Sequence, residues 1–319
     1  MSFVDPSISL TREPGGYRVE QHRPPAGAVL GSLELDAALG QVNALLPICG
    51  VAQRIAAGRA IAAARGESES RETMARRDQL LLHEQVQSSI WRLTVDWPAL
   101  LGEERDLATL RFAMRTTDTS TLQALLADKL DGLAAVSDID DLSAWIERHG
   151  CTASRLVDAA RALDRELGDV QETTAPIPVR TPGDVLAACL DHGFWPEADA
   201  PLAPPPGEVG ATAMARHPLT ASLAGAFGVL AGRLLAQALD AAFLVTADAA
   251  SAGLGHGVGS KRLAGPADES AIGRGSATDA TPREPVTGIG WAMTARGPLV
   301  HRVVLGQADA SRPLLRHVR

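Results

Sequence analysis

The sequence predicts a mainly α fold with minor β structure (α+β). Apolar side chains recur at helical spacing in several long stretches, and aromatic residues make up only 3% of the chain. A core of this composition must be built from small and aliphatic side chains on closely packed helices. Near the C-terminus, two short apolar runs flank Ala295-Arg296-Gly297-Pro298, a pattern typical of a β-hairpin.

Length and charge exclude several classes of protein. The chain has 319 residues, enough for a sizeable core, and a net charge of -8. It has no run rich in Lys or Arg, which argues against a nucleic-acid-binding protein. No uninterrupted apolar stretch reaches the ~18 residues of a transmembrane span, and residues 1–13 lack the order of a signal peptide. We therefore expect a cytoplasmic protein without membrane contact.

Strands and then helices are expected in the N-terminal third. Pro and Gly residues border two strand candidates, and Gly66 closes the first helix after them. One of residues 68–70 caps the second helix, which is predicted to end at Pro98. The predicted strands cover 17–20 and 28–35, and the predicted helices cover 51–65 and 71–95.

The remainder of the chain is predicted to alternate helices with polar linkers. Asp138, Asp140 and Asp141 lack the rest of a calcium-loop motif, so they indicate an acidic helix start. A stretch dominated by Gly, Ser, Ala, Asp and Pro at 249–285 is expected to be a mobile loop. The predicted helices are two pieces within 103–129 separated by 116–120, then 142–148, 153–167, 183–191 and 219–246. The linkers are 169–182 and 196–209, and the hairpin strands are 287–293 and 299–305.

The three cysteines lie too far apart for a zinc-finger spacing or a dense disulfide framework. Cys49 stands where a loop turns into a helix, and unsatisfied N–H groups there favour a metal-binding thiolate. The alternative is a buried structural cysteine. Cys151 also precedes a helix and is interpreted as structural, and no role is assigned to Cys189. His83 lies on a polar helical stripe, which is more typical of a half-buried flank than of a ligand set.

Two motifs together resemble the large-subunit family of nickel-iron hydrogenases. Cys49-Gly50-Val51 before an Ala-rich helix is similar to the family motif R-I-C-G-V-C, and residues 294–301, TARGPLVH, are similar to E-A-P-R-G-x-L-x-H. The stretch 83–98 and Ala213-Met214-Ala215-Arg216-His217-Pro218 resemble the hydrogenase expression/formation proteins of the HupK and HoxV type. These proteins are short paralogues of the large subunit.

The departures from the catalytic large subunit concern its metal ligands. Ala52 stands where the family has its second cysteine, and Pro47 stands where it has arginine. The C-terminal family motif D-P-C-x-x-C-x-x-H has no counterpart before Arg319. At most one of four thiolates remains, too few to hold a nickel-iron pair. The resemblance therefore implies an accessory protein that is not an enzyme, and no nickel is expected.

The resemblance implies one large-subunit-like domain over 1–319 and a site where the first helix meets the hairpin turn. Cys49 would hold a transient Fe(CN)2(CO) intermediate through one thiolate, and Arg296 would donate to the cyanide nitrogens. His301 would contact the cofactor, although a histidine bonded within the core is an equal alternative, and Arg296 could be a solvated surface charge. The implied partners are hydrogenase maturation chaperones and the large-subunit precursor.

Two other functions remain open from the sequence. The first is a degenerate redox subunit of a hydrogenase-like or respiratory complex, which predicts stable association with an iron-sulfur subunit. The second is a metal-free interaction protein that docks maturation chaperones.

Overall fold

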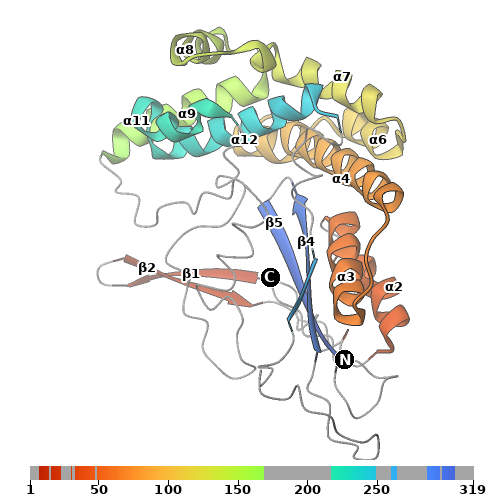
Figure 1. Ribbon diagram of the computed structural model, residues 1–319. Helices are drawn as coiled ribbons and strands as arrows, with labels where there is room; N and C mark the ends of the chain where they lie inside the picture. The colour runs from red at the N-terminus through yellow and green to blue at the C-terminus, as the bar shows by residue number, and fades with distance from the viewer. Residues whose placement is uncertain are drawn as a thin grey trace, which may run out of the picture.

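The computed structural model describes residues 7–13, 16–22, 30, 33–46, 49–168, 217–248, 260–263, 286–294 and 297–305. It confirms the mainly α class with minor β structure. Figure 1 shows a group of helices above a smaller part, in which helices lie beside antiparallel strands. The predicted linkers 169–182 and 196–209, the predicted helix 183–191, Cys189 and Arg296 lie outside the described residues.

Helices outnumber strands among the described elements. The α-helices are α2 Leu35–Leu45, α3 Gly50–Arg65, α4 Arg71–Trp91, α5 Trp97–Leu100, α6 Leu107–Arg115, α7 Thr119–Leu130, α8 Ile139–Arg148, α9 Thr152–Leu167, α11 Leu223–Phe227 and α12 Val229–Thr246. Shorter helical turns are η1 Arg92–Asp96, η2 Leu133–Ala135 and η4 Pro218–Ser222. The strands are β1 Ser7–Glu13, β2 Gly16–His22, β3 Ser260–Leu263, β4 Val286–Thr294 and β5 Gly297–Leu305.

Local capping explains why most predicted helix boundaries are confirmed. The Ser70 hydroxyl accepts the Thr73 amide at the start of α4, and Asp138 accepts the Asp141 amide at the start of α8. Asp106 and Asp118 cap α6 and α7 in the same way, so the two predicted pieces within 103–129 are separate helices. Each cap uses a side chain within three residues of its partner, and such signals are legible in sequence.

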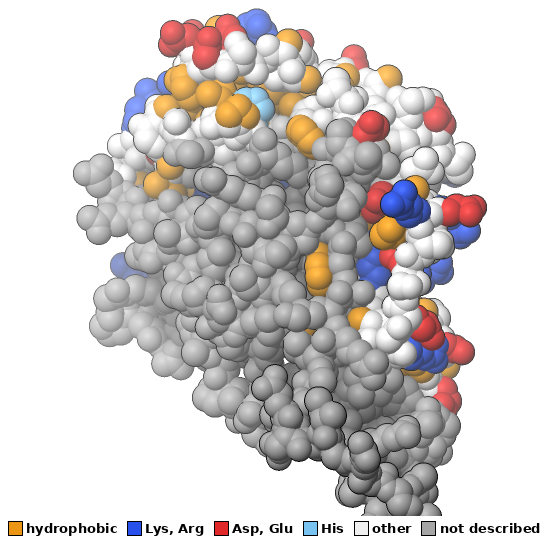
Figure 2. All heavy atoms as spheres, in the orientation of Figure 1, with side chains coloured by type: hydrophobic (Ala, Val, Ile, Leu, Met, Phe, Trp, Pro, Cys, Tyr) orange, Lys and Arg blue, Asp and Glu red, His pale blue; other side chains and the backbone are white. Residues whose placement is uncertain are grey.

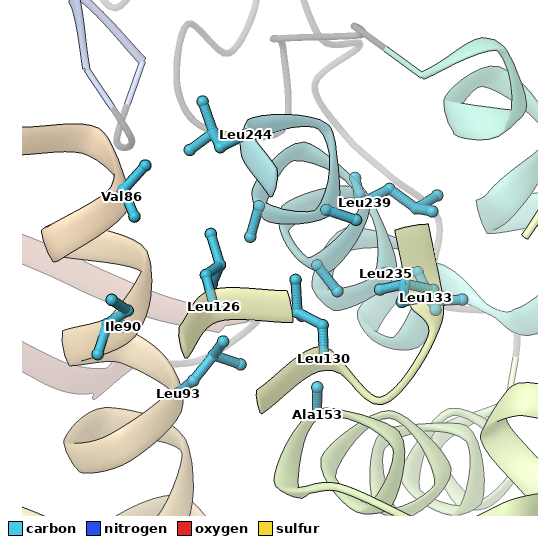
Figure 3. Packing of buried hydrophobic residues seen from close by; sticks show 14 of the residues in the cluster. Val86, Ile90, Leu93, Leu126, Leu130, Leu133, Ala153, Leu235, Leu239 and Leu244 are labelled. Carbon is cyan, nitrogen blue, oxygen red and sulfur yellow. The ribbon is translucent and has the colours of Figure 1, made fainter. Parts of the chain in front are cut away.

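The main core lies between α4, α7, α9 and α12. Figure 3 shows aliphatic side chains of α4 facing those of α7, with the α12 side chains beyond them. Trp145 of α8 is 1% exposed, and its indole N–H donates to the carbonyl of Leu130 at 3.0 Å. The labelled members of this core are Val86, Ile90, Leu93, Leu126, Leu130, Leu133, Ala153, Leu235, Leu239 and Leu244.

Pro98 does not end the helix that begins at Arg71, so that prediction is wrong. The backbone widens into the π-helical turn η1 and then continues as α5, where Pro98 occupies one of the first two positions. A proline cannot donate to the carbonyl four residues earlier, which belongs to Thr94. The amide of Asp106 donates to that carbonyl instead, at 2.8 Å.

The single helix predicted over 219–246 is also wrong, because the chain breaks at Gly228. Its φ of 98° is left-handed, and it separates α11 from α12. An alanine Cβ at Gly232 would lie under 3.0 Å from the backbone of Ala224, so α11 and α12 approach each other closely.

In the described part of the chain, α12 alone is long and apolar enough to cross a membrane by length and composition. It packs against α9, α7 and α4, and its Ala238 and Leu239 are fully buried. This packing is that of a core helix, as Arg233 and Asp240 within the helix also suggest.

The N-terminal strand prediction is confirmed at 17–20, which lies within β2, but its partner is β1. The second predicted strand, 28–35, is wrong at its end because Leu35 begins α2. Helix α2 was not predicted. Its buried residues Leu35, Ala38 and Val42 follow helical spacing, and this pattern outweighs the loose alternation read before them.

The predicted C-terminal hairpin is confirmed as β4 and β5, which pair antiparallel from Val286↔Leu305 to Thr294↔Gly297. Strand β3 adds to the other edge of β4 and gives the order β3-β4-β5. Residues 260–263 therefore form a strand inside the predicted mobile loop 249–285, and the rest of that segment lies outside the described residues.

Both signs of charge share the surface. On the face in Figure 2, acidic and basic side chains alternate along the edge where α4 and α2 lie in Figure 1. The described part of this face shows no continuous basic area.

Candidate functional site at the start of helix α3

Helix α3 packs directly on strands β4 and β5 through small residues. Gly288 lies against Ala60 and Ala64, and Gly290 lies against Ala56 and Ala60. An added Cβ at either glycine would fall well under 3.0 Å from helix backbone atoms. The two glycines therefore permit a helix–strand approach that no other residue allows.

This packing fixes the direction of the hairpin. Gly288 meets Ala60 and Ala64. Gly290, further along β4, meets Ala56 and Ala60, which lie one turn closer to the start of α3. The Thr294–Gly297 end of the hairpin therefore points toward the start of α3. The resemblance implied that arrangement. Ala295 and Arg296, between those two residues, lie outside the described residues, so the place of Arg296 stays a prediction.

His301 lies in the α3–hairpin interface, opposite Gly290 on the neighbouring strand. It is 1% exposed, and its Nε2 lies 2.7 Å from Oε1 of Gln53. This distance is that of a hydrogen bond, whose donor depends on the tautomer of the histidine. The structure thus agrees with the alternative of a core histidine. Gln53 is one turn after Cys49, whose carbonyl accepts the Gln53 amide at 2.9 Å.

Cys49 occupies the N-cap position of α3 in a left-handed conformation, with φ 56° and ψ 42°. It is half-buried, and its side chain makes no capping hydrogen bond. A non-glycine residue pays about 1–2 kcal/mol to adopt this conformation. Strain of this kind is concentrated at functional sites.

Glu84 of α4 satisfies the first turn of α3. Its Oε1 accepts the amide of Val51 at 2.8 Å, and its Oε2 accepts the amide of Ala52 at 2.9 Å. The premise that these N–H groups are unsatisfied beside Cys49 is therefore wrong. Burial raises the pKa of the Glu84 carboxyl above its ordinary value, and the two amide bonds oppose that shift.

A buried charge cluster connects α3, α4 and the hairpin. Arg59 is 2% exposed, its Nε donates to Glu69 at 3.0 Å, and its Nη1 donates to the carbonyl of Trp291 at 3.4 Å. Its Nη2 lies 3.9 Å from Oδ1 of Asp78, and Arg77 contacts the other Glu69 oxygen. Burial raises the pKa of Asp78, and the Arg59 charge opposes that shift.

The remaining candidates have structural surroundings. Cys151 is buried at the start of α9, with its Sγ 3.7 Å from Oγ of Ser154, in agreement with a structural role. The Nδ1 of His83 lies 3.0 Å from Oγ1 of Thr119, and burial lowers the pKa of His83. Among the described residues, no group of three or more His, Cys, Asp and Glu side chains is placed to hold a metal ion.

Sequence reasoning missed Glu84, Gln53 and the two glycines of β4. Gly288 and Gly290 had a readable signal, because alternate glycines in a strand mark the close approach of another backbone. Glu84 had none, since its partners lie more than thirty residues earlier in the chain.

The fold and site define a mainly α protein with minor strands, whose candidate site is a left-handed cysteine at the start of a helix that packs on a hairpin. No family model matches the sequence. The chain is similar to the hydrogenase expression/formation protein HupK of Azotobacter vinelandii. The two are 29% identical over 294 residues, which cover 90% of this chain and 76% of the relative. This likeness agrees with the resemblance of the motifs to proteins of the HupK and HoxV type.

Proposed function

We propose that this chain is an accessory, non-catalytic protein of hydrogenase expression and formation, acting in the cytoplasm. The similarity to HupK over 90% of the chain carries this proposal. The absence of a second cysteine at Ala52 supports a role other than catalysis, because a bimetallic site needs several thiolates.

The cargo in this proposal is an Fe(CN)2(CO) intermediate attached to the Cys49 sulfur. Cys49 is half-buried and left-handed at the N-cap of α3, and its side chain makes no capping hydrogen bond there. Arg296, which lies in the sequence between the last residue of β4 and the first residue of β5, would donate to the cyanide nitrogens. His301 would support the site through Gln53, because its Nε2 is bound there and its ring is buried.

Attachment through one thiolate favours release. Such a carrier would receive the iron unit from maturation chaperones and transfer it to the hydrogenase large-subunit precursor. Nickel has no place in this step, since one sulfur does not form a nickel site.

Replacing Cys49 tests the proposal in a host that lacks its own copy of this protein. We expect Cys49→Ser and Cys49→Gly to lower mature hydrogenase activity at least about tenfold, since both remove the sulfur that binds iron. Glycine relieves the left-handed strain, so Cys49→Gly should unfold at the same denaturant concentration as wild type or a higher one.

Cys151→Ser is the matched control, because it removes a sulfur from the start of α9 instead. It is expected to retain maturation. Wild-type maturation by both Cys49 variants would refute the carrier role.

A further inference from the structure

Glu84 performs for α3 the task that an N-cap side chain usually performs. An N-cap residue normally accepts the amide of the second or third helical residue. In α3 these residues are Val51 and Ala52, and both amides donate to Glu84 from another helix. Cys49, at the N-cap itself, is thereby relieved of capping.

The same arrangement occurs at α12, which gives an internal comparison. Asp164 of α9 accepts the amides of Leu230 and Ala231 at 3.1 and 3.0 Å, and these are the second and third residues of α12. The N-cap there is Gly228, also with positive φ. An added Cβ at Gly228 would lie under 3.0 Å from the Asp164 side chain.

The two helix starts differ in the residue at the strained position. Where a carboxylate from another helix caps the second and third amides, the N-cap residue has a positive φ in both cases, although ψ differs, at 42° for Cys49 and 166° for Gly228. Glycine adopts a positive φ without a steric penalty and occupies the N-cap of α12, whereas the N-cap of α3 is a cysteine, which adopts its positive φ at a conformational cost. The sulfur at α3 is therefore retained against the local preference of the backbone.

We infer that Glu84 is a positioning residue for Cys49: it accepts the amides of Val51 and Ala52, holds the first turn of α3 in place and puts a carboxylate at the positive end of that helix beside the cysteine. This inference rests on the proposed function for its biological meaning. Whether Glu84 controls the reactivity of the Cys49 thiol can be tested separately.

The test compares Glu84→Gln with Asp164→Asn in the full-length protein. Each amide side chain has one oxygen where the carboxylate has two, so in the native geometry both variants lose one cap bond of the same kind. Iodoacetamide labelling at pH 7, followed by peptide mass spectrometry, measures the rate at Cys49, with Cys151 and Cys189 as internal references. Denaturant unfolding of both variants shows whether their losses of stability match.

We expect Glu84→Gln to raise the labelling rate of Cys49 about threefold, because a negative charge is removed and an amide is exposed to the sulfur. Asp164→Asn should leave that rate unchanged. A Cys49 rate in Glu84→Gln equal to that of wild type, or changed no more than in Asp164→Asn, would overturn the inference. Normal maturation by Cys49→Ser would instead remove the carrier role and leave the labelling result to decide the role of Glu84.

Discussion

Gly290→Ala is expected to lower the free energy of unfolding by about 3 kcal/mol, because overpacking a closed interface forces backbone movement. The new methyl group would meet the carbonyl oxygen of Ala56 and the amide of Ala60 at less than 3.0 Å. Both are backbone atoms of α3, so no side-chain rotation relieves the contact. The helix and the hairpin must separate, and the Thr294–Gly297 end of the hairpin must move relative to Cys49.

Urea unfolding followed by circular dichroism measures this change. Gly40→Ala is the matched control, because Gly40 lies inside α2 with no atom within 4 Å of an added Cβ. It should raise stability by about 0.5–1 kcal/mol, the usual difference between alanine and glycine in a helix. Equal stability of Gly290→Ala and wild type would contradict the close packing of α3 on β4.

Arg59→Met is expected to lower the free energy of unfolding by about 3–5 kcal/mol, the range for removing one partner of a buried ion pair. The substitution leaves Glu69 and Asp78 without the guanidinium between them and leaves the Trp291 carbonyl without its donor. Arg77→Met is the control, because Arg77 is half-exposed and its contact with Glu69 is worth at most about 1 kcal/mol.

The loss in Arg59→Met should also depend on pH. Burial already raises the pKa of Asp78 and the Arg59 charge opposes this, so removing Arg59 raises that pKa further. A carboxyl with a raised folded-state pKa favours the folded protein at low pH, and stability falls as pH rises through that pKa. Thermal unfolding should therefore show a smaller deficit at pH 5 than at pH 8. A deficit that is small at both values, like that of Arg77→Met, would contradict the buried cluster.

Helices could be predicted where the determinant is local. Ser70, Asp106, Asp118 and Asp138 each cap a helix within three residues of themselves, and their positions were readable. The prediction that the helix ends at Pro98 was wrong because the amide of Asp106 makes the hydrogen bond that the proline cannot make. The break at Gly228 was hidden because its apolar stripe continues through it, and because the capping carboxylate, Asp164, comes from another helix.

The candidate site could be predicted only in part. Cys49 at a helix start is a sequence pattern, and the structure places it at the N-cap of α3. The hairpin could also be predicted, but its direction along α3 depends on Gly288 and Gly290 meeting Ala60. The Glu84 cap and the Gln53–His301 bond join residues 32 and 248 positions apart, so no local pattern signals them. The role of Arg296 stays a prediction.

Infrared spectroscopy of the anaerobically purified protein, produced together with the hydrogenase maturation machinery, tests the central claim most directly. If Cys49 carries an Fe(CN)2(CO) unit, the wild-type protein will show the stretching bands of iron-bound cyanide and carbon monoxide, and Cys49→Ser will lack them. Cys151→Ser should keep the bands. A wild-type protein without such bands, or a Cys49→Ser protein with the same bands, would contradict the carrier function.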